Sequence, residues 1–248
     1  MKLFCDVPFY NEVDYLPDCI ASLARQTDSD FTLVLVDNTS NDGSGAIAKK
    51  TLDALKIKNA KVIVEPEKGT GSAADSGFRY AIAHGATHIA RTDADCVADP
   101  SWIAEIKAAF AGGVELVWGK LGYRGDDMPV RLKDRVLFPL AVWISDVYGA
   151  LVWRGPQYKS PYRMGGGNNM AITADLYIKA GGFPRKPLEE QDDDVALFDA
   201  ARKQTPNARR CKQVRSYTSL RRTRKYGYLR TMLYYWGRKY TPKEVDVR

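Results

Sequence analysis

Two aspartates, Asp93 and Asp95, stand two positions apart directly after a short apolar segment, residues 87–90, that predicts a strand. A divalent cation that bridges phosphates needs oxygen ligands. Mg²⁺ usually takes only one or two carboxylates from the protein, because substrate oxygens and water fill its other positions. Aspartates at this spacing also form ordinary turns in which one of them caps the next helix. The pair therefore predicts either a cation site or a helix cap.

A second acidic cluster holds five carboxylates within six residues. Acidic side chains in the first turn of a helix favour its macrodipole by about 0.3–1 kcal/mol each, which explains some of them without any function. Five exceed that need, and like charges so close together repel. The cluster therefore predicts a bound cation, a basic partner or a carboxyl group with a raised pKa. Its members are Glu189, Glu190, Asp192, Asp193 and Asp194.

More polar side chains follow the first two predicted strands. Pro8, Tyr10 and Glu12 come at the end of the first strand, and Asp37 and Asn38 follow the second. In open sheets of parallel strands, ligands bind beyond the carboxyl ends of the strands. We therefore expect these side chains to share one rim of the sheet with the two aspartates of the fourth strand.

Short β-branched segments alternate with helical patterns along most of the chain. This order predicts an α/β fold with one Rossmann-like, mostly parallel sheet that helices flank on both faces. The predicted strands are residues 2–7, 31–36, 61–64, 87–90, 114–118 and 168–172. The predicted helices are residues 13–24, with Asp14 as cap, and 42–58, 72–84, 99–111, 174–179, 192–203 and 226–240.

The chain between residues 122 and 164 breaks this rhythm and mixes charges with large aromatic side chains. We expect one or two helices around residues 130–153 and a loop at residues 154–164. The longest uninterrupted apolar run, residues 136–144, is shorter than the roughly 20 residues that a spanning helix needs, so we predict no membrane crossing. The first residues lack the apolar stretch of a signal peptide, and the four cysteines are widely spaced. Both features predict a cytoplasmic protein with reduced thiols.

Composition predicts one large domain, since 248 residues with 45% hydrophobic side chains can bury a core without disulfides. The net charge of +7 is unevenly distributed: residues 209–248 carry thirteen Lys and Arg against two acids. Such a segment favours an anionic partner, which could be a diphosphate, a phospholipid head group or a nucleic acid.

The end of this basic segment is also rich in aromatic residues. A helix with aromatic and basic side chains suits a membrane interface, but a helix docked on the protein's own core would show the same apolar stripe. Residues 134–153 could join it as an interface or as the surface of a homodimer. Stacking of bases on the aromatic rings would instead favour nucleic acid, although no known nucleic-acid-binding motif is present. The apolar residues are Tyr226, Tyr228, Leu229, Met232, Leu233, Tyr235 and Trp236.

Four segments, read in order, resemble the motif series of family 2 glycosyltransferases of the GT-A fold. They are residues 7–12 (VPFYNE), 36–44 (VDNTSNDGS), 92–95 (TDAD) and 165–169 (GGGNN). The resemblance covers roughly residues 1–220 and implies a donor-binding half, residues 1–120, and an acceptor-binding half, residues 121–220. Residues 221–248 would then form a basic aromatic tail.

The resemblance also implies roles for individual residues. Asp95 would bind an Mg²⁺ or Mn²⁺ ion on the donor diphosphate, and Asp93 would approach the ribose or the metal. Relatives often have an arginine where Ala74 stands, so the basic group for the donor would come from Arg79, Arg91 or the tail. The nucleoside pocket would comprise Pro8, Tyr10, Glu12, Asp37 and Asn38; the diphosphate would meet Arg221 or Arg222; and the acceptor would meet Gly166, Gly167, Asn168 and Asn169.

The acidic cluster matches the family segment that carries the general base. Here it reads QDDDV at residues 191–195, which implies Asp192 as the base, with Asp193 and Glu190 as the alternatives. The resemblance thus implies an inverting transfer of a sugar from a nucleoside-diphosphate donor to an acceptor hydroxyl, which could be lipid-linked. A nucleic-acid-binding protein and a sugar-nucleotide binder without catalysis are the alternative hypotheses.

Overall fold

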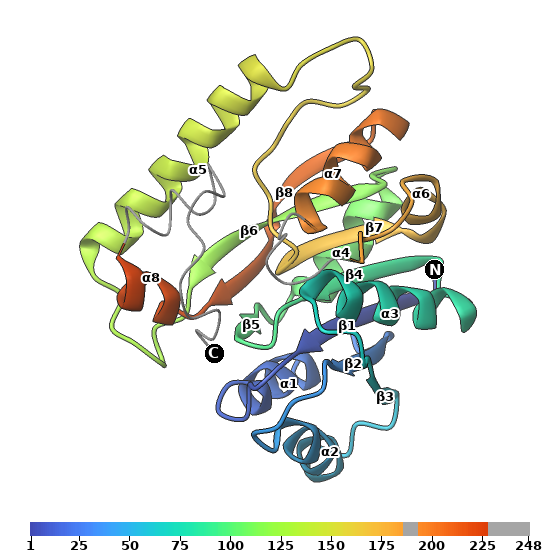
Figure 1. The fold of residues 1–248 in the computed structure, drawn as a ribbon, viewed down its shortest axis with the longest axis vertical. Coiled ribbons are helices and arrows are strands. Elements are labelled where there is room, and N and C mark those ends of the chain that lie inside the picture. Colours follow the sequence, from blue (N-terminus) through green and yellow to red (C-terminus); the bar gives the residue numbers. More distant parts are fainter. Residues whose placement is uncertain (186–192, 228–248) are drawn as a thin grey trace.

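The computed structural model describes residues 1–185 and 193–227, which form one eight-stranded sheet with helices on both faces (Figure 1). The strand order is β3-β2-β1-β4-β7-β6-β8-β5. The predicted α/β class with a mostly parallel sheet is confirmed. The strands are β1 (Leu3–Phe9), β2 (Thr32–Asp37), β3 (Ala60–Val64), β4 (His88–Thr92), β5 (Cys96–Ala98), β6 (Leu116–Tyr123), β7 (Asn169–Thr173) and β8 (Ala208–Thr218).

Strand pairing brings distant motifs to one edge of the sheet. Strands β3, β2, β1 and β4 run parallel, so their carboxyl ends share one edge, and Phe9 lies opposite Asp37. Strand β7 then pairs antiparallel with β4 and sets Thr92 opposite Asn169. The segment after β4 and the segment before β7 therefore meet at the same edge.

Alternation of apolar side chains along the central strands explains why both faces of the sheet are covered. In β1, Cys5 and Val7 pack on one face, while Phe4 packs on the other. The first face contacts α1 (Leu16–Ala24), α2 (Ser44–Ala54) and α4 (Trp102–Ala111), and the second contacts α3 (Thr70–Ala83), α6 (Ala174–Lys179) and α7 (Asp193–Gln204).

All six predicted strands are present, and so are the first six predicted helices. The seventh, residues 226–240, lies almost entirely outside the described residues. Asp14 as the cap of α1 was wrong, because the helix begins after Tyr15 and no side chain caps it. Two strands were not predicted, β5 and β8. Strand β8 contains Arg209 and Arg215, so part of the basic segment belongs to the sheet rather than to a tail.

The region that breaks the rhythm forms one long helix, α5 (Leu132–Val152), along one side of the molecule (Figure 1). It is followed by residues 154–164 without helix or strand, as predicted. By length and composition alone, α5 could cross a membrane. The uninterrupted apolar run of residues 136–144, from which we predicted no membrane crossing, is shorter than this helix. The last described helix is the short α8 (Arg221–Tyr226), close to the lower end of α5 in Figure 1.

Candidate active site at the carboxyl edge of the sheet

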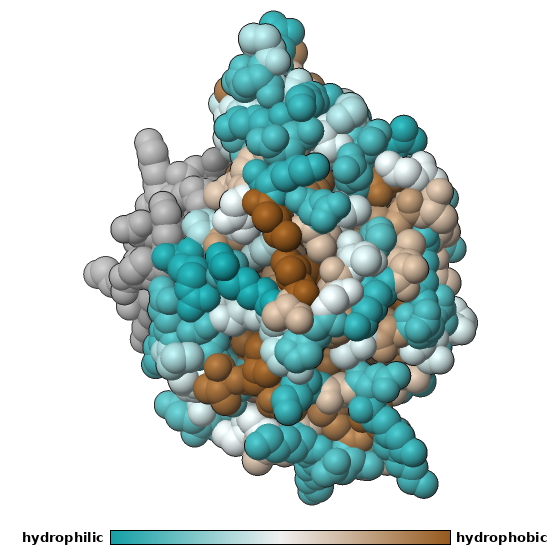
Figure 2. Space-filling view, turned by 90° about the vertical axis from the view of Figure 1, so that its right-hand side faces the viewer, coloured by the Kyte–Doolittle hydropathy of each residue, from teal (hydrophilic) through white to brown (hydrophobic). Residues whose placement is uncertain are grey.

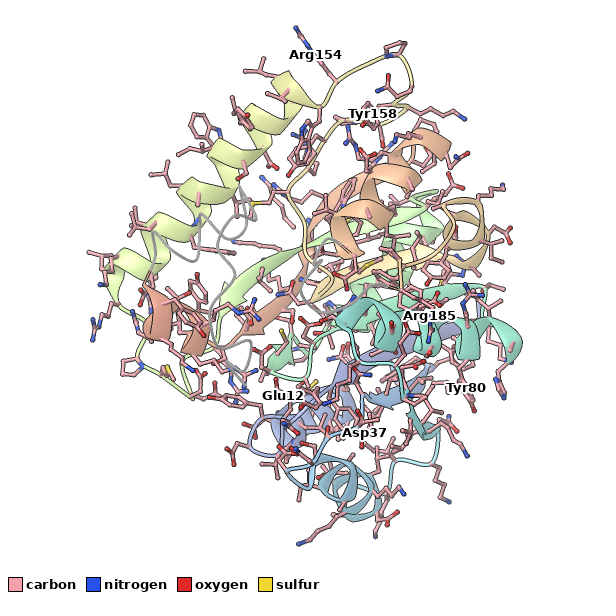
Figure 3. All side chains as sticks on the ribbon, viewed as in Figure 1. Glu12, Asp37, Tyr80, Arg154, Tyr158 and Arg185 are labelled. Atoms are coloured by element: carbon pink, nitrogen blue, oxygen red, sulfur yellow. The ribbon has the colours of Figure 1, made fainter. Side chains whose placement is uncertain are left out.

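The loop after β1 is fixed by hydrogen bonds to the loop after β2. The backbone N–H of Asn11 donates to Ser40 Oγ at 3.1 Å, and that of Glu12 donates to Ser44 Oγ at 2.7 Å. Asn11 itself has a left-handed backbone, with φ of 53°. Figure 3 labels Glu12, which follows β1, and Asp37, the last residue of β2, at this edge of the sheet. The sequence motifs at residues 7–12 and 36–44 therefore form one structural unit.

The predicted nucleoside-binding residues differ in what their side chains can reach. Asn38 is buried: its amide nitrogen donates to the carbonyls of Glu65 and Glu67, and its oxygen accepts from Gly69 N–H at 2.9 Å. The amide of Asn38, which the resemblance placed in the nucleoside pocket, is thus already bonded within the protein, and Asn38 shapes the loop before α3. Pro8 is buried inside β1.

Two of these residues remain at the surface of the rim. The ring of Tyr10 is partly exposed and lies 5.2 Å from Lys68 Nζ, in a cation–π contact. Asp37 accepts the N–H of Ser40 at 2.8 Å through one carboxylate oxygen. Since a flat ring and a second carboxylate oxygen lie at the same rim, this part of the site suits a planar base and a ribose hydroxyl.

Asp93 and Asp95 lie beyond β4, as predicted, and each already contacts one guanidinium. Asp93 Oδ1 is 3.3 Å from Arg91 Nη2, and Asp95 Oδ2 is 3.2 Å from Arg221 Nη2. Their side chains are 38% and 19% exposed, so both carboxylates can still be reached from solvent. Neither acts as a simple helix cap, because α4 begins after Ser101.

Arg221 joins residues that are more than two hundred positions apart in the chain. Its guanidinium bonds both carboxylate oxygens of Glu12, at 2.8 Å for the Nη1–Oε2 pair, and stacks 4.4 Å from the ring centroid of Tyr15. Its remaining contact is Asp95. Charge-assisted bidentate pairs of this kind are among the stronger hydrogen bonds in proteins. One cation therefore connects the predicted nucleoside pocket with the predicted metal carboxylate, and Arg222 follows it in α8.

A second guanidinium, Arg91, is buried at the centre of the site. Burial opposes its charge, but the carboxylates of Asp93, Asp193, Asp6 and Asp194 outweigh that effect and raise its pKa. Among the described residues its Nε and Nη1 have no hydrogen-bond partner, while its guanidinium lies 5.1 Å from the ring centroid of Phe183. Of the cations proposed from the sequence for the donor, Arg91 and Arg221 are at the site, whereas Arg79 pairs with Asp75 and is 67% exposed.

The glycine-rich segment before β7 contacts the acidic cluster. The N–H of Gly167 donates to Asp194 Oδ2 at 3.0 Å, and the carbonyl of Asn168 accepts from Thr92 Oγ1 at 3.1 Å. A Cβ on Gly167 would lie 2.7 Å from Arg91 Nη1, so a larger residue here would displace the buried guanidinium of Arg91. The segment with Gly166, Gly167 and Asn168 is thus held between β4 and α7.

Asn169 does not face the site, although we predicted that it binds the acceptor. Its side chain is buried; the oxygen accepts from Trp102 Nε1 at 2.8 Å, and the nitrogen donates to the carbonyls of Lys120 and Val214. All of its polar atoms are used inside the protein. Asn169 therefore ties β6, β7 and β8 to α4.

The acidic cluster is described only in part, since Glu190 and Asp192 lie outside the described residues. Asp193 and Asp194 form the first turn of α7. Burial, together with the charge of Asp193, raises the pKa of Asp194 to about 6, although the hydrogen bond from Gly167 opposes this shift. Asp193 Oδ2 is buried without a hydrogen-bond partner among the described residues. The raised pKa that the cluster predicted is therefore found at Asp194, which sequence reasoning had not singled out.

A divalent cation fits the carboxylates of this site. No group of three or more His, Cys, Asp or Glu side chains within residues 1–185 and 193–227 could hold a metal. Mg²⁺ needs only one or two protein carboxylates when phosphate oxygens and water complete its shell, and Asp93 and Asp95 are two partly exposed carboxylates at this edge. The contact of Arg221 with Asp95 shows that this carboxylate already stabilises positive charge.

Comparison with known sequences and structures places this geometry in a family. The sequence of residues 7–171 matches the family described as glycosyl transferase family 2, and the chain belongs to that family. It is 37% identical over 75 residues to the uncharacterized glycosyltransferase EpsJ of Bacillus subtilis (strain 168), which covers 30% of this chain and 21% of that protein. It is also 34% identical over 110 residues to a Nostoc glycosyltransferase, alr2836, of which it spans 33%.

Solved structures share the fold at low sequence identity. The mannosyltransferase PcManGT from Pyrobaculum calidifontis, solved with GDP-Man and Mn²⁺, superposes with a TM-score of 0.64 at 17% identity, over 97% of this chain and 65% of that one. Glucosyl-3-phosphoglycerate synthase from Mycobacterium tuberculosis, solved with Mn²⁺ and UDP, gives a TM-score of 0.58 at 17% identity, over 95% and 78%. The chain thus has the fold of these GT-A transferases but spans only part of the length of most relatives it matches.

Proposed function

We propose that this protein transfers a sugar from a nucleoside-diphosphate sugar to an acceptor hydroxyl, with inversion at the anomeric carbon. The observation that carries the proposal is the meeting of Glu12, Asp95 and Arg221 at the carboxyl edge of the sheet, next to Asp93 and Arg91. Carboxylates for a cation and guanidinium groups for phosphate are the two elements that a diphosphate leaving group requires. Family membership supports the same assignment.

The donor diphosphate would compete with carboxylates for Arg221. In the structure this guanidinium is bound to Glu12 and Asp95. Phosphate oxygens accept bidentate hydrogen bonds from arginine, so we expect Arg221 to turn from Asp95 toward the diphosphate when a donor binds. Asp95 and Asp93 would then hold a divalent cation. This cation would neutralise the negative charge that develops on the leaving diphosphate.

Activation of the acceptor would fall to the acidic cluster. We propose Asp192 as the general base that removes the hydroxyl proton, with Asp193 as the alternative. Such proton removal typically contributes about 10²–10⁴ in rate. We expect Asp194 to position the glycine-rich segment rather than to remove the proton, because each of its oxygens accepts an N–H, one from Gly167 and one from Val195. Its bond to Gly167 would hold the glycine-rich segment, where Gly166 and Asn168 can contact the acceptor.

Some of the described basic residues near the carboxyl terminus are paired within the protein, and others are exposed. Arg210 pairs with Asp146, Arg221 with Glu12, and Arg224 with Asp134. Arg209, Lys212 and Arg215 on β8 are exposed, as binding to a phosphate backbone requires, so the nucleic-acid alternative rests on these positions.

Calorimetric titration with UDP, GDP and dTDP, with and without Mn²⁺, tests the proposal. We expect one nucleotide to bind more tightly when Mn²⁺ is present, and Asp95→Asn to remove that dependence. Asp53→Asn is the matched control, because Asp53 is an exposed aspartate on α2 away from the site. Nucleotide affinity that is the same with and without Mn²⁺, and the same in Asp95→Asn, would contradict the proposed cation site. Binding of every nucleotide without turnover of any sugar donor would favour a non-catalytic binder.

A further inference from the structure

Helix α5 is apolar on its outer side and polar or small on its inner side. Eleven of the fifteen exposed large hydrophobic residues in the described part of the chain lie on it or at its end. The buried positions are instead Asp134, Ala141, Ser145 and Gly149. A surface helix of a water-soluble domain normally shows the opposite arrangement. The exposed residues are Leu132, Val136, Leu137, Leu140, Trp143, Ile144, Val147, Tyr148, Leu151, Val152 and Trp153.

The inner side of α5 is fixed to the domain along its length. At the first turn, Asp134 is fully buried and pairs with Arg224. In the second half, Asp146 accepts the N–H of Met164 at 2.7 Å and pairs with Arg210 of β8. The ring of Tyr162 packs so closely on Gly149 that a Cβ there would overlap it. Because the inner side is held in this way, the helix lies along the domain and presents its apolar side outward.

Basic residues flank this apolar side, and acidic residues are missing from it. Arg131 and Arg135 are exposed at the first turn, and Arg154 is exposed just beyond the last turn, where Figure 3 labels it. The only acids between residues 131 and 154 are Asp134 and Asp146, which face the domain. On the face at the right-hand side of Figure 1, away from α5, hydrophilic residues predominate with short apolar strips between them (Figure 2).

We propose that the outer face of α5 is a docking surface for a membrane that contains anionic phospholipid. A helix of 21 residues is about 31 Å long. An apolar stripe of that length with two tryptophans, a tyrosine and basic ends has the features of helices that lie in the plane of a bilayer interface. Isolated exposed apolar residues need no explanation, but a continuous stripe of this kind marks an interaction site.

Charge favours a lipid surface over a second copy of the chain. In a two-fold dimer with antiparallel α5 helices, Arg131 and Arg135 of one copy would approach Arg154 of the other. Like charges placed together across an interface oppose association. An anionic lipid surface meets the same cations with opposite charge, and each basic residue near such a surface raises affinity about fivefold.

Flotation of the full chain with phosphatidylcholine vesicles, with and without phosphatidylglycerol, tests the proposal. We expect binding that requires phosphatidylglycerol. The triple variant Trp143→Glu, Val147→Glu, Leu151→Glu should lower affinity more than about 100-fold, since three apolar contacts are lost and three anions are added. The matched control is Val64→Glu with Ile178→Glu, two positions that are 66% and 60% exposed but lie on β3 and α6. The control should bind as the parent chain does.

Two further variants separate the contributions to binding. Arg135→Gln with Arg154→Gln should lower affinity for the anionic vesicles about 25-fold. A chain that ends at Gly227 keeps Arg221 and Arg224 and removes only residues 228–248, so it tests the part of the predicted basic aromatic tail that follows residue 227. It should retain binding that depends on α5. All substituted positions are exposed, so circular dichroism and thermal unfolding should match the parent chain.

Three outcomes would overturn the proposal. The first is no flotation of the parent chain with anionic vesicles. The second is equal flotation of the parent chain and the α5 triple variant, with binding lost only on removal of residues 228–248. The third is a dimer in light scattering that the triple variant abolishes while vesicles bind neither protein, which would make a second copy the occupant. The proposal is independent of sugar transfer, because vesicle binding needs no donor.

Discussion

Replacement of Arg221 by glutamine should change cation binding and diphosphate binding in opposite directions. In the structure Arg221 Nη2 lies 3.2 Å from Asp95 Oδ2, on a carboxylate that is 19% exposed. A divalent cation must displace this guanidinium before it can bind Asp95. The substitution Arg221→Gln removes the competitor and leaves the carboxylate with a free oxygen. We therefore expect Mn²⁺ alone to bind the variant more tightly than the parent protein.

The size of the effect follows from the contact that is lost. Hydrogen bonds to charged groups contribute about 1.5–3 kcal/mol net, and the long distance and partial exposure favour the lower value. About 1.5 kcal/mol corresponds to roughly a tenfold lower Kd for Mn²⁺. The same substitution removes a bidentate phosphate donor, so the Kd of the nucleoside diphosphate measured with saturating Mn²⁺ should rise about tenfold or more.

Titration calorimetry of each ligand measures both effects, with Arg224→Gln as control. Arg224 lies on the same short helix and pairs with the buried Asp134, so its loss disturbs α8 without touching Asp95. An equal change of Mn²⁺ affinity in both variants would show that α8, not the Arg221–Asp95 contact, determines the result. An Arg221→Gln variant with unchanged Mn²⁺ affinity would show that Arg221 does not compete with the cation for Asp95.

Three other predictions concern stability and can be checked by urea unfolding. Asp194 has a folded pKa of about 6, above its unfolded value, so its contribution is present below the unfolded pKa and is lost as the pH rises toward 6. This contribution to the free energy of unfolding should fall by up to about 3 kcal/mol over that window, so Asp194→Asn should change how the free energy of unfolding depends on pH; the same pH dependence in the variant and the parent chain would contradict the shift. Gly77→Ala should lower the free energy of unfolding by about 1–3 kcal/mol, because the new Cβ would overlap the buried Asp6 carboxyl. Gly125→Ala has room for a Cβ and should change the free energy of unfolding little. Asn169→Ala should cost about 1–3 kcal/mol, since it leaves the N–H of Trp102 and two carbonyls without partners; no loss would mean that water replaces the amide.

The sequence predicted the central half of the sheet well because its strands are buried on both faces. Strands β1, β2 and β4 are almost wholly buried, and each contains a short apolar run, at residues 3–5, 33–36 and 89–90, so pattern and structure agree. Strand β8 was missed for the opposite reason. Only Ala208, Val214 and Ser216 of its eleven residues are buried, and its charged residues read as a tail. A strand whose side chains are mostly solvated lacks the regular alternation of apolar residues from which strands are predicted.

At the site, the sequence predicted positions better than orientations. The rim was correctly located, since the motifs at residues 92–95 and 165–169 do meet. Which way a polar side chain points depends on pairing that local sequence does not encode. Asn169 therefore looked like a ligand for the acceptor, although it is a buried bridge between strands. The pairing of Glu12 with Arg221 spans the whole fold and could not be inferred from either motif alone.

The most direct test of the proposed function is turnover of a panel of UDP-, GDP- and dTDP-sugars, followed by NMR of the released or transferred sugar in the first minutes. We expect one donor to be cleaved to its nucleoside diphosphate, with the anomeric configuration inverted, and we expect Asp95→Asn and Asp192→Asn to abolish this while Asp53→Asn does not. A product that retains the configuration of the donor, or cleavage that survives loss of Asp95, would contradict it.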